Sequence, residues 1–381
     1  MKITGFTVLM LLVANLAMCQ PLGSWFKDLE SKPLAERTRK IDSLLSVSSR
    51  IPIIESDTNV YFIYKGDAGS VFIAGDATGW APALAMHKIG GTDTWYCMES
   101  YEASARLEYK FVINKSEWIL DPLNPRKVTG GTGQNSEILM PAYEYPHDID
   151  ERDVVPWGTE FDTLIHSKYL SENRAFRIIL PASYDKGNKS YPLVFFHDGY
   201  DFFKYTAARN VINNMIFERK IQPVIAVFVE PVHRDDEYSG RLQKNYTRFM
   251  VNELIPFMDR NYRTEARAES RAQIGISNGG NIALWLVASQ PGKTAKAAAM
   301  SSNVMKNVGN AFQKGGCRNQ MIYLLLGKYD LPPLIPMVRN LNEQLRKHGC
   351  QVSYHEYPEG HSWKYWEKYL PDALEYFFPA K

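Results

Sequence analysis

The chain has 381 residues, 45% of them hydrophobic, and its 44 basic and 42 acidic residues leave a formal net charge of +2. This length is ample for a large core and long for a single domain. Because the sequence shows neither a strong basic stripe nor a large net charge, nucleic acid is not expected as a partner.

Residues 1–19 have the layout of a secretory signal peptide, because Lys2 precedes an apolar run that ends in small residues. We expect cleavage after Cys19 and export to the periplasm or the extracellular space. A buried helix is the alternative. The letters LAMC also resemble a lipoprotein signal, but Met18 fits that signal poorly. No later segment is long and apolar enough to predict a transmembrane helix.

The texture of the sequence changes along the next part of the chain. Residues 20–55 are typical of a helical leader and linker, with one amphipathic helix over Lys27–Val47. Residues 56–145 hold short β-branched and aromatic runs separated by Gly, Asp and Asn. Such runs predict a small all-β, immunoglobulin-like sandwich of two antiparallel sheets. Residues 146–160 belong to a stretch rich in Asp, Pro and Tyr, which predicts a second linker.

From residue 161 to 381, strand-like and helix-like segments alternate. Several strand-like runs are almost continuously apolar, as in parallel strands that are covered on both faces. This alternation predicts a mostly parallel sheet with helices on both sides. The predicted strands are FRIILP, YPLVFF, PVIAVFVE, AQIGIS, KAAAMS, MIYLLLG and VSYHEYP. The predicted helices are Ala207–Arg219, Phe249–Tyr262, Asn281–Ser289, Leu334–His348 and Trp363–Phe378.

A serine lies between glycines where a predicted strand meets a predicted helix. Residues 275–279 read G-I-S-N-G, the G-x-S-x-G pattern of a nucleophile elbow in its strand–turn–helix setting. The glycines allow a sharp turn that lifts the Ser277 hydroxyl above the sheet edge. An ordinary turn serine is the alternative, and the setting favours the nucleophile.

A serine nucleophile needs a base and an acid that orients the base. In this fold the chain order should be Ser, then Asp or Glu, then His. Asp330 follows the strand MIYLLLG and His361 follows VSYHEYP, so both should reach the same sheet edge as Ser277. Other candidates in the sequence are less well placed: the acids Glu356 and Glu359, and the histidines His166, His348 and His355.

Backbone N–H groups are expected to hold the oxyanion that such a reaction develops. Asn278 begins the helix after the serine, so its N–H should face the reaction site. A second N–H usually comes from the loop after an earlier strand. The stretch HDGY after YPLVFF supplies Gly199 and Tyr200 there. An ordinary Asp-Gly turn is the alternative.

Cysteine spacing suggests one disulfide in an exported chain. Cys317 lies just before MIYLLLG, and Cys350 lies just before VSYHEYP. If these are neighbouring parallel strands, both cysteines lie at the same sheet end and can pair. Cys97 is expected to stay free.

Several ordered motifs together resemble the esterase family of enterochelin esterases, feruloyl esterases and esterase D-like enzymes. They are FFHDGYDFF, VEPVHRDDEY, NELIPFMDRNYRTEARAESRAQIGISNGGNIALW and YPEGHSWKYWEKYL, within Phe176–Phe378. The resemblance implies an α/β-hydrolase fold with a triad at Ser277, Asp330 and His361. Arg234 then borders the active site and could bind an anionic or phenolic group, or simply pair with Asp235, Asp236 or Glu237. Trp363 and Trp366 could stack on an aromatic acyl group or pack in the core.

The β segment resembles the glycogen-binding type of carbohydrate-binding module, family 48, through VFIAGDATGW, LEYKFVI and SEWILDPLNPR. Where such modules bind glucans, tryptophans and a lysine contact the sugar. The corresponding positions are Trp80, Lys110 and Trp118, with Asn135 as a looser match. The alternative, which we favour, is that the segment serves only as a structural domain.

Taken together, the sequence predicts an exported serine hydrolase of carboxylic esters, with neither metal nor organic cofactor. The β module and export favour a plant-polysaccharide ester, such as a feruloyl or acetyl xylan. Hydrolysis of an enterochelin-type siderophore ester and acyl transfer to a sugar are the enzymatic alternatives. A glucan-binding protein with an inactive hydrolase domain is the alternative of another class.

Overall fold

The computed structural model describes residues 20–317 and 319–380, so the predicted signal peptide at residues 1–19 lies outside the described range. The chain divides into two compact units. The β unit runs up to Val128 and includes Gln134–Tyr143, and the α/β unit comprises Thr129–Gly133 and the chain from Glu144 onward. No helix in the described ranges is long and apolar enough to cross a membrane.

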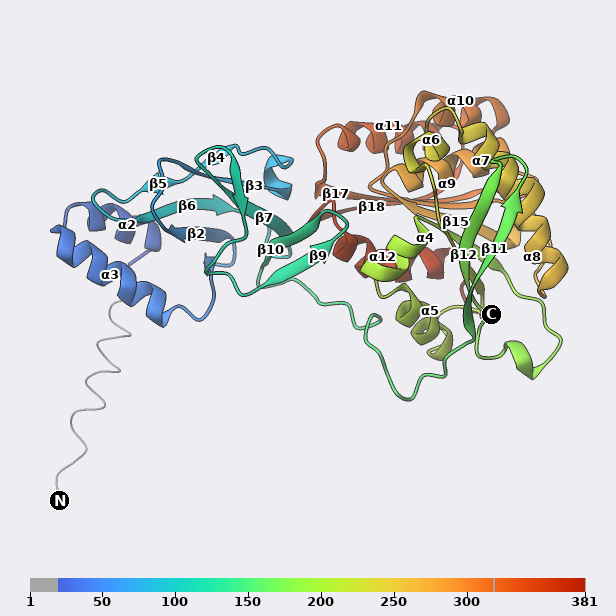
Figure 1. Ribbon diagram of the computed structural model, residues 1–381, viewed down its shortest axis with the longest axis horizontal. Coiled ribbons are helices and arrows are strands. Elements are labelled where there is room, and N and C mark those ends of the chain that lie inside the picture. The colour runs from blue at the N-terminus through green and yellow to red at the C-terminus, as the bar shows by residue number, and fades with distance from the viewer. Residues whose placement is uncertain (1–19, 318, 381) are drawn as a thin grey trace, which may run out of the picture. The chain divides into compact units, whose positions relative to one another are not determined.

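The β unit contains two sheets of antiparallel strands (Figure 1), which confirms the expected all-β region. One sheet has the order β1-β2-β6-β5, and in the other β7 pairs with β3, β8 and β10. The strands are β1 Ile53–Glu55, β2 Asn59–Lys65, β3 Val71–Gly75, β4 Leu84–Ala85, β5 His87–Lys88, β6 Thr94–Ser100, β7 Arg106–Ile113, β8 Glu117–Ile119, β9 Lys127–Gly130 and β10 Gly133–Leu139.

Strand β2 is buried on both faces, which explains its continuous apolar sequence. On one face Phe62 meets Tyr109 of β7 edge-on, with ring centroids 5.0 Å apart. On the other face Tyr61 and Ile63 pack against the helices α2 (Leu22–Glu30) and α3 (Leu34–Val47). The prediction of one helix over Lys27–Val47 is wrong. Pro33 caps α3 and has no N–H to continue α2, so the chain breaks into two helices there.

The α/β unit is built on a mixed sheet with the order β11-β12-β14-β13-β15-β16-β17-β18. Strand β12 runs antiparallel to both neighbours, and the strands from β14 to β18 are parallel. The bounds are β11 Glu160–Ser167, β12 Glu172–Ile179, β13 Leu193–His197, β14 Ile225–Val229, β15 Arg271–Ile276, β16 Lys296–Met300, β17 Met321–Tyr329 and β18 Gln351–Gly360. Every strand predicted here is present, and only β11 was missed.

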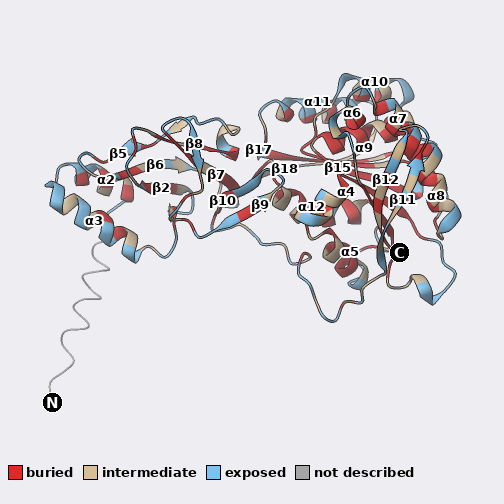
Figure 2. Ribbon diagram, viewed as in Figure 1, coloured by how far each residue is buried: buried red, intermediate tan, exposed pale blue. Residues whose placement is uncertain are grey.

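Helices cover both faces of this sheet, as expected for the α/β-hydrolase fold. Along β13, Val194 and Phe196 pack toward α4, α5 and α12, whereas Leu193 and Phe195 face the opposite layer. Figure 2 accordingly shows buried strands between helices with exposed outer sides. The helices are α4 Gly199–Tyr205, α5 Ala208–Phe217, α6 Arg234–Tyr238, α7 Gln243–Phe249, α8 Ile255–Asn261, α9 Asn278–Ser289, α10 Lys306–Gly315, α11 Leu334–Lys347 and α12 Trp363–Phe377.

A disulfide joins Cys317 and Cys350, which precede the parallel neighbours β17 and β18, and Cys97 is free. The bridge closes a loop with a sequence separation of 33. Breaking a loop of that size should lower the free energy of unfolding by about 3–4 kcal/mol. We expect this loss for the double variant Cys317→Ser/Cys350→Ser in urea unfolding, whereas Cys97→Ser should change little. Equal stability of the double variant and the wild type would contradict the expectation.

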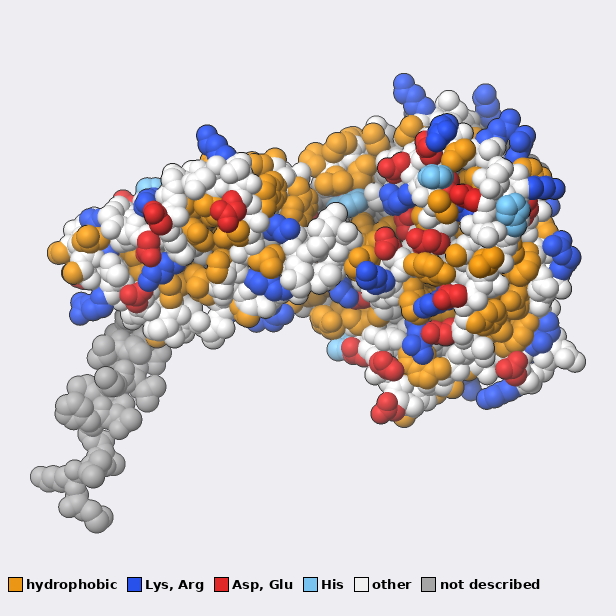
Figure 3. Space-filling view, in the orientation of Figure 1, with side chains coloured by type: hydrophobic (Ala, Val, Ile, Leu, Met, Phe, Trp, Pro, Cys, Tyr) orange, Lys and Arg blue, Asp and Glu red, His pale blue; other side chains and the backbone are white. Residues whose placement is uncertain are grey.

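Charged side chains of both signs intermingle on the face of the molecule that Figure 3 shows. This distribution agrees with the near balance of 44 basic and 42 acidic residues.

Candidate active site

Ser277 forms a sharp turn between β15 and α9. Its backbone has φ 49° and ψ −123°, a region that non-glycine residues rarely occupy, and its N–H donates to the Met300 carbonyl at 2.8 Å. A Cβ on Gly275 would lie 2.0 Å from the Gly279 carbonyl oxygen, so only glycine fits at that position. Such strained backbone typically costs about 1–3 kcal/mol and is concentrated at functional sites. The local geometry is that of a nucleophile elbow.

His361 and Asp330 form a hydrogen-bonded pair at the same edge of the sheet. Asp330 follows β17, His361 follows β18, and His361 Nδ1 lies 2.7 Å from Asp330 Oδ1. The His361 side chain is 16% exposed, whereas Asp330 is buried. Burial by itself raises the pKa of Asp330, but the hydrogen bond and charge of His361 outweigh it and hold that pKa below its usual value. Asp330 therefore stays ionised and can orient the imidazole.

The competing side chains are committed elsewhere. Glu356 forms a two-bonded ion pair with Arg339, and His355 Nε2 lies 2.8 Å from the Ser353 hydroxyl. No hydrogen bond joins Ser277 to His361 in the described structure. Bonds between a nucleophile and its base are often long without substrate and tighten when it binds.

Asn278 opens α9 directly after Ser277. As the first residue of the helix, its N–H has no carbonyl one turn earlier to bind. Its side chain is fixed from two sides, because Nδ2 donates to Asp235 Oδ1 at 2.9 Å and Oδ1 accepts from Asn303 at 3.1 Å. The amide N–H and the positive end of the helix dipole can both stabilise an oxyanion at this point.

Gly199 and Tyr200 begin α4, and their placement corrects the expected oxyanion donor. The N–H of Tyr200 donates to Glu230 Oε2 at 2.9 Å, so it is already occupied. Glu230 follows β14 and is half-buried, and burial raises the pKa of its carboxyl group. A Cβ on Gly199 would lie 2.3 Å from the Phe228 carbonyl carbon, so the glycine allows close contact between α4 and β14. Sequence reasoning missed Glu230, because β14, which it follows, is five positions from β18 in the sheet order.

Arg234 is held by a carboxylate that none of the expected pairings included. Its Nε and Nη2 donate to the two oxygens of Asp198 at 2.6 and 2.7 Å, and Nη1 lies 3.8 Å from Asp235. The expected alternatives Asp236 and Glu237 instead pair with Arg241 and Arg174. Asp198 lies against the elbow, with Oδ2 2.8 Å from where a Cβ on Gly279 would be. The Arg234 side chain is 38% exposed, so its Nη1 edge can still meet a ligand.

The two tryptophans after His361 differ in accessibility. Trp366 is buried and meets the His361 ring edge-on, with centroids 4.9 Å apart at 88°. Trp363 is half-buried and packs against Tyr205 and Phe202 of α4. Tyr205 and Lys364 also line an open cleft of about 340 Å³ between α4 and α12. Trp363 is thus half-buried next to residues that line the cleft, whereas Trp366 belongs to the core.

The residues of the β unit that were predicted to contact glycan also differ in how accessible their side chains are. Trp118 on β8 is 45% exposed, and Lys110 on β7 is half-buried. Trp80 Nε1 instead donates to buried Asp76, and Asn135 Nδ2 donates to buried Glu108. Asn135 is thus a buried structural residue, whereas Trp80 is half-buried with only its indole N–H occupied. Trp118 and Lys110 are the two predicted residues whose side chains form neither of these buried hydrogen bonds.

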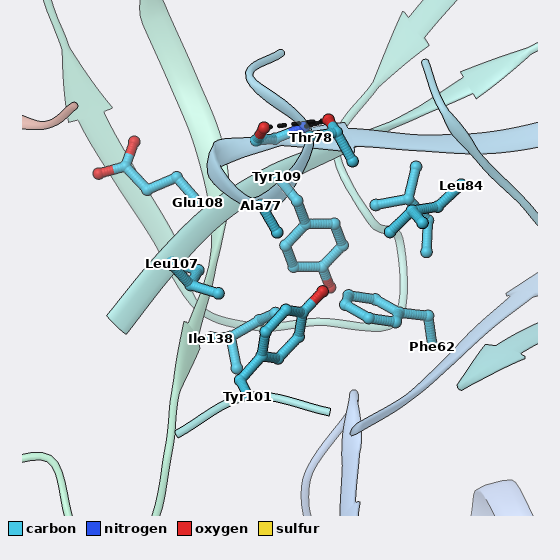
Figure 4. A pocket seen from close by; sticks show the side chains of 11 residues that line it. Phe62, Ala77, Thr78, Leu84, Tyr101, Leu107, Glu108, Tyr109 and Ile138 are labelled. Atoms are coloured by element: carbon cyan, nitrogen blue, oxygen red, sulfur yellow. Dashed lines mark hydrogen bonds between the residues drawn. The ribbon is translucent and has the colours of Figure 1, made fainter. Parts of the chain in front are cut away.

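A small cavity lies between the two sheets of the β unit (Figure 4). Phe62, Tyr101, Tyr109 and Ile138 surround it, and its volume is about 10 Å³. Such a volume holds at most about one water molecule, so a sugar cannot enter.

A buried histidine below the elbow links stability to pH. His197 Nε2 donates to Gln273 Oε1 at 3.1 Å, its Nδ1 lies 3.1 Å from the Tyr246 hydroxyl, and burial lowers the pKa of His197 to about 3. The unfolded chain takes up this proton near the ordinary pKa of about 6.5. Stability from this group is therefore complete above that pH and falls as pH drops toward 3.

We expect the free energy of unfolding to fall by about 2 kcal/mol between pH 6.5 and 4.5 because of His197 alone. Urea unfolding of His197→Gln at both pH values should show a loss smaller by that amount. An equal loss in the variant and the wild type would rule out this assignment.

The fold and the site define an α/β-hydrolase with a serine elbow and a His–Asp pair at the sheet edge. Residues 167–322 match the family described as "Putative esterase". The α/β unit is therefore similar to this esterase family, and the chain is a carboxylic ester hydrolase.

Curated relatives are similar to part of the chain. "Uncharacterized protein YjcH" of Bacillus subtilis is 25% identical over 233 residues, which are 57% of this chain and 97% of that protein. "Esterase Rv1288" of Mycobacterium tuberculosis is 28% identical over 165 residues, which are 40% of this chain and 34% of that protein.

Solved structures share the fold at lower identity. The ferric enterobactin esterase of Salmonella typhimurium has a TM-score of 0.73 at 18% identity and covers 88% of this chain and 98% of its own. The ferulic acid esterase AmCE1/Fae1A of Anaeromyces mucronatus has a TM-score of 0.53 at 17% identity and covers 62% and 96%.

Proposed function

We propose that this hydrolase works through Ser277 as nucleophile, His361 as base and Asp330 as the group that orients the base. The observation that carries the proposal is the strained serine turn at the same sheet edge as the His361–Asp330 bond of 2.7 Å. Asp330 accepts a hydrogen bond from Nδ1–H of His361, which leaves Nε2 free to take the serine proton.

In the first half of the reaction, Ser277 Oγ attacks the ester carbonyl and His361 accepts its proton. The Asn278 N–H stabilises the negative oxygen of the tetrahedral intermediate. His361 then returns the proton to the alcohol, which leaves an acyl-enzyme. In the second half, the water oxygen attacks the acyl carbonyl carbon while His361 accepts a proton from the water. The bond between that carbon and Ser277 Oγ then breaks, His361 returns the proton to Ser277, and the carboxylic acid is released.

For the substrate, we propose an ester of a phenolic aromatic acid. Arg234 supports this choice, because Asp198 fixes its guanidinium and leaves the Nη1 edge for a phenolate or carboxylate. Trp363 offers a half-buried ring beside the cleft between α4 and α12. Feruloyl esters of plant polysaccharide and catecholate siderophore esters share this chemistry.

Between these two, the siderophore ester has one additional observation in its favour. The enterobactin esterase likeness extends over 88% of this chain, whereas the ferulic acid esterase likeness extends over 62%. We also propose export, which the signal-like residues 1–19 and the disulfide support. Glycan contact by Trp118 and Lys110 remains a separate proposal for the β unit.

A substrate panel tests the proposal directly. Purified protein would be assayed with p-nitrophenyl acetate, methyl ferulate, acetylated xylan and a catecholate trilactone. We expect hydrolysis of the aromatic esters with a kcat/KM well above that of the acetyl esters. Preference for acetylated xylan, or acyl transfer to a sugar in place of hydrolysis, would overturn the substrate assignment.

The role of Arg234 can be tested with a conservative variant. Arg234→Lys keeps a positive charge beside Asp198 but loses the planar pair of donors. We expect KM for the aromatic ester to rise about 10-fold or more, as for loss of a charged hydrogen bond. KM for p-nitrophenyl acetate should stay unchanged. Arg241→Lys is the matched control, because Arg241 follows the same helix α6 and pairs with Asp236. Equal effects of both variants on both substrates would exclude the binding role.

A further inference from the structure

Ser301 lies at the carboxyl end of β16, between the strands that carry Ser277 and Asp330. It is fully buried, and its backbone has φ 51°, in the left-handed region that favours glycine. Its N–H donates to the Leu325 carbonyl at 2.8 Å, which fixes the turn against β17. Serine strains the backbone in this conformation, whereas glycine adopts it freely. The side chain therefore has a use that glycine could not meet.

The Ser301 hydroxyl connects two side chains. Trp366 Nε1 donates to Ser301 Oγ at 2.9 Å. An indole N–H can only donate, so the Ser301 oxygen accepts there and its own hydrogen is available for another acceptor. We assign the Asp330 carboxylate as that acceptor, because the Ser301 hydroxyl is one of the groups that lower the pKa of Asp330. In this assignment the hydrogen bonds run from Trp366 through Ser301 to Asp330.

Trp366 also contacts the other member of the pair. Its ring stands perpendicular to the His361 ring, with centroids 4.9 Å apart, and its side chain is buried on α12. One indole therefore packs against His361 and, through Ser301, binds the carboxylate that orients His361. The titratable side chains that interact with Asp330 include His361, through the hydrogen bond, and buried Tyr365, whose pKa the Asp330 charge helps to raise.

We propose that Ser301 and Trp366 are positioning residues that hold Asp330, and through it His361, in the geometry that activates Ser277. This inference rests on the proposed triad and extends it to a Trp366–Ser301–Asp330–His361 chain. Neither residue touches the substrate. Losing the Ser301 hydroxyl removes one donor from Asp330, so its charge acts more strongly on His361. The protonated imidazole is then favoured, and the acid limb of the kcat/KM profile should move to higher pH.

The test compares variants of the full-length protein with one aromatic ester. Ser301→Gly keeps the left-handed backbone without strain and lacks the hydroxyl, and Ser301→Ala lacks the hydroxyl and keeps the strain. Trp366→Phe keeps a ring beside His361 and loses the N–H. The control is Trp285→Phe, because Trp285 Nε1 donates to the Thr247 hydroxyl at 3.0 Å, away from the triad.

We expect kcat to fall about 10-fold in both Ser301 variants and in Trp366→Phe, in line with one lost charge-assisted bond. KM should stay within about 2-fold, and the acid limb should shift upward by as much as about one pH unit. Ser301→Gly should melt at or above the wild-type temperature, and Trp285→Phe should keep wild-type kcat.

Wild-type kcat and pH profile in Ser301→Gly would overturn the positioning role. A kcat loss without any pH shift would also overturn it, because a purely structural defect has that signature. Ser277→Ala, measured in parallel, distinguishes failure of the proposed triad from failure of the proposed positioning role. If that variant remains active, the triad itself fails, whereas an inactive Ser277→Ala beside a fully active Ser301→Gly rejects only the positioning chain.

Discussion

Replacing Ser277 by alanine should lower kcat by roughly 10⁴–10⁶-fold, because a serine hydrolase without its nucleophile keeps only binding and oxyanion stabilisation. Substrate binding should persist, so KM or the Kd of a non-hydrolysable ester analogue should change little. Rate measurements with p-nitrophenyl acetate and an aromatic ester would show the loss for both. Activity within 10-fold of the wild type would rule out Ser277 as the nucleophile.

Ser277→Gly provides the matching stability control. Glycine adopts the φ 49° of this turn without strain, so this variant should be as inactive as Ser277→Ala. Its free energy of unfolding should exceed that of Ser277→Ala by about 1 kcal/mol or more. Urea unfolding of the two variants measures the free energy of unfolding that a non-glycine residue costs in this turn. A glycine variant less stable than the alanine variant would contradict the strain at this position.

Replacing Asp330 by asparagine should lower kcat about 10⁴-fold while leaving the fold intact. The carboxylate accepts from His361 Nδ1 at 2.7 Å, and an amide that donates there would place the remaining ring proton on Nε2. An imidazole with that tautomer cannot accept the serine proton. Steady-state kinetics measures the effect, and circular dichroism checks that the variant is folded.

Glu356→Gln is the control for this substitution. Glu356 is near His361 in the sequence, but its carboxylate pairs with Arg339 and Tyr354 at the surface. We expect its kcat to equal that of the wild type. If Asp330→Asn and Glu356→Gln have similar activities, Asp330 does not orient the base.

The parallel core of the fold could be predicted because burial on both faces leaves a strong sequence signal. Strands such as β13 and β15 are continuous apolar runs with turn residues at both ends. The missed strand β11 alternates exposed and half-buried residues at the sheet edge, so its sequence resembles a polar loop. Helices α4 and α6 are 7 and 5 residues long and show no full amphipathic period.

The residues of the candidate site also differ in whether a local sequence pattern predicts them. Ser277, Asp330 and His361 could be predicted because each follows a recognisable strand, and parallel strands bring their carboxyl ends together. The pairs Arg234–Asp198 and Tyr200–Glu230 depend on side chains that approach each other across loops, and no local pattern encodes them. Ser301 follows β16 at the same sheet edge, so the rule that predicted the positions of Ser277, Asp330 and His361 could have predicted its position as well.

Covalent labelling tests directly whether Ser277 is the activated nucleophile. A fluorophosphonate reacts with an activated serine and with few others, because the reaction needs the same base and oxyanion donors as ester attack. The wild type should gain one label, mapped by peptide mass spectrometry to Ser277. Ser277→Ala should gain none, and Asp330→Asn should react far more slowly. Labelling at another residue, or ester hydrolysis by a chain that takes up no label, would contradict the role of Ser277 as nucleophile.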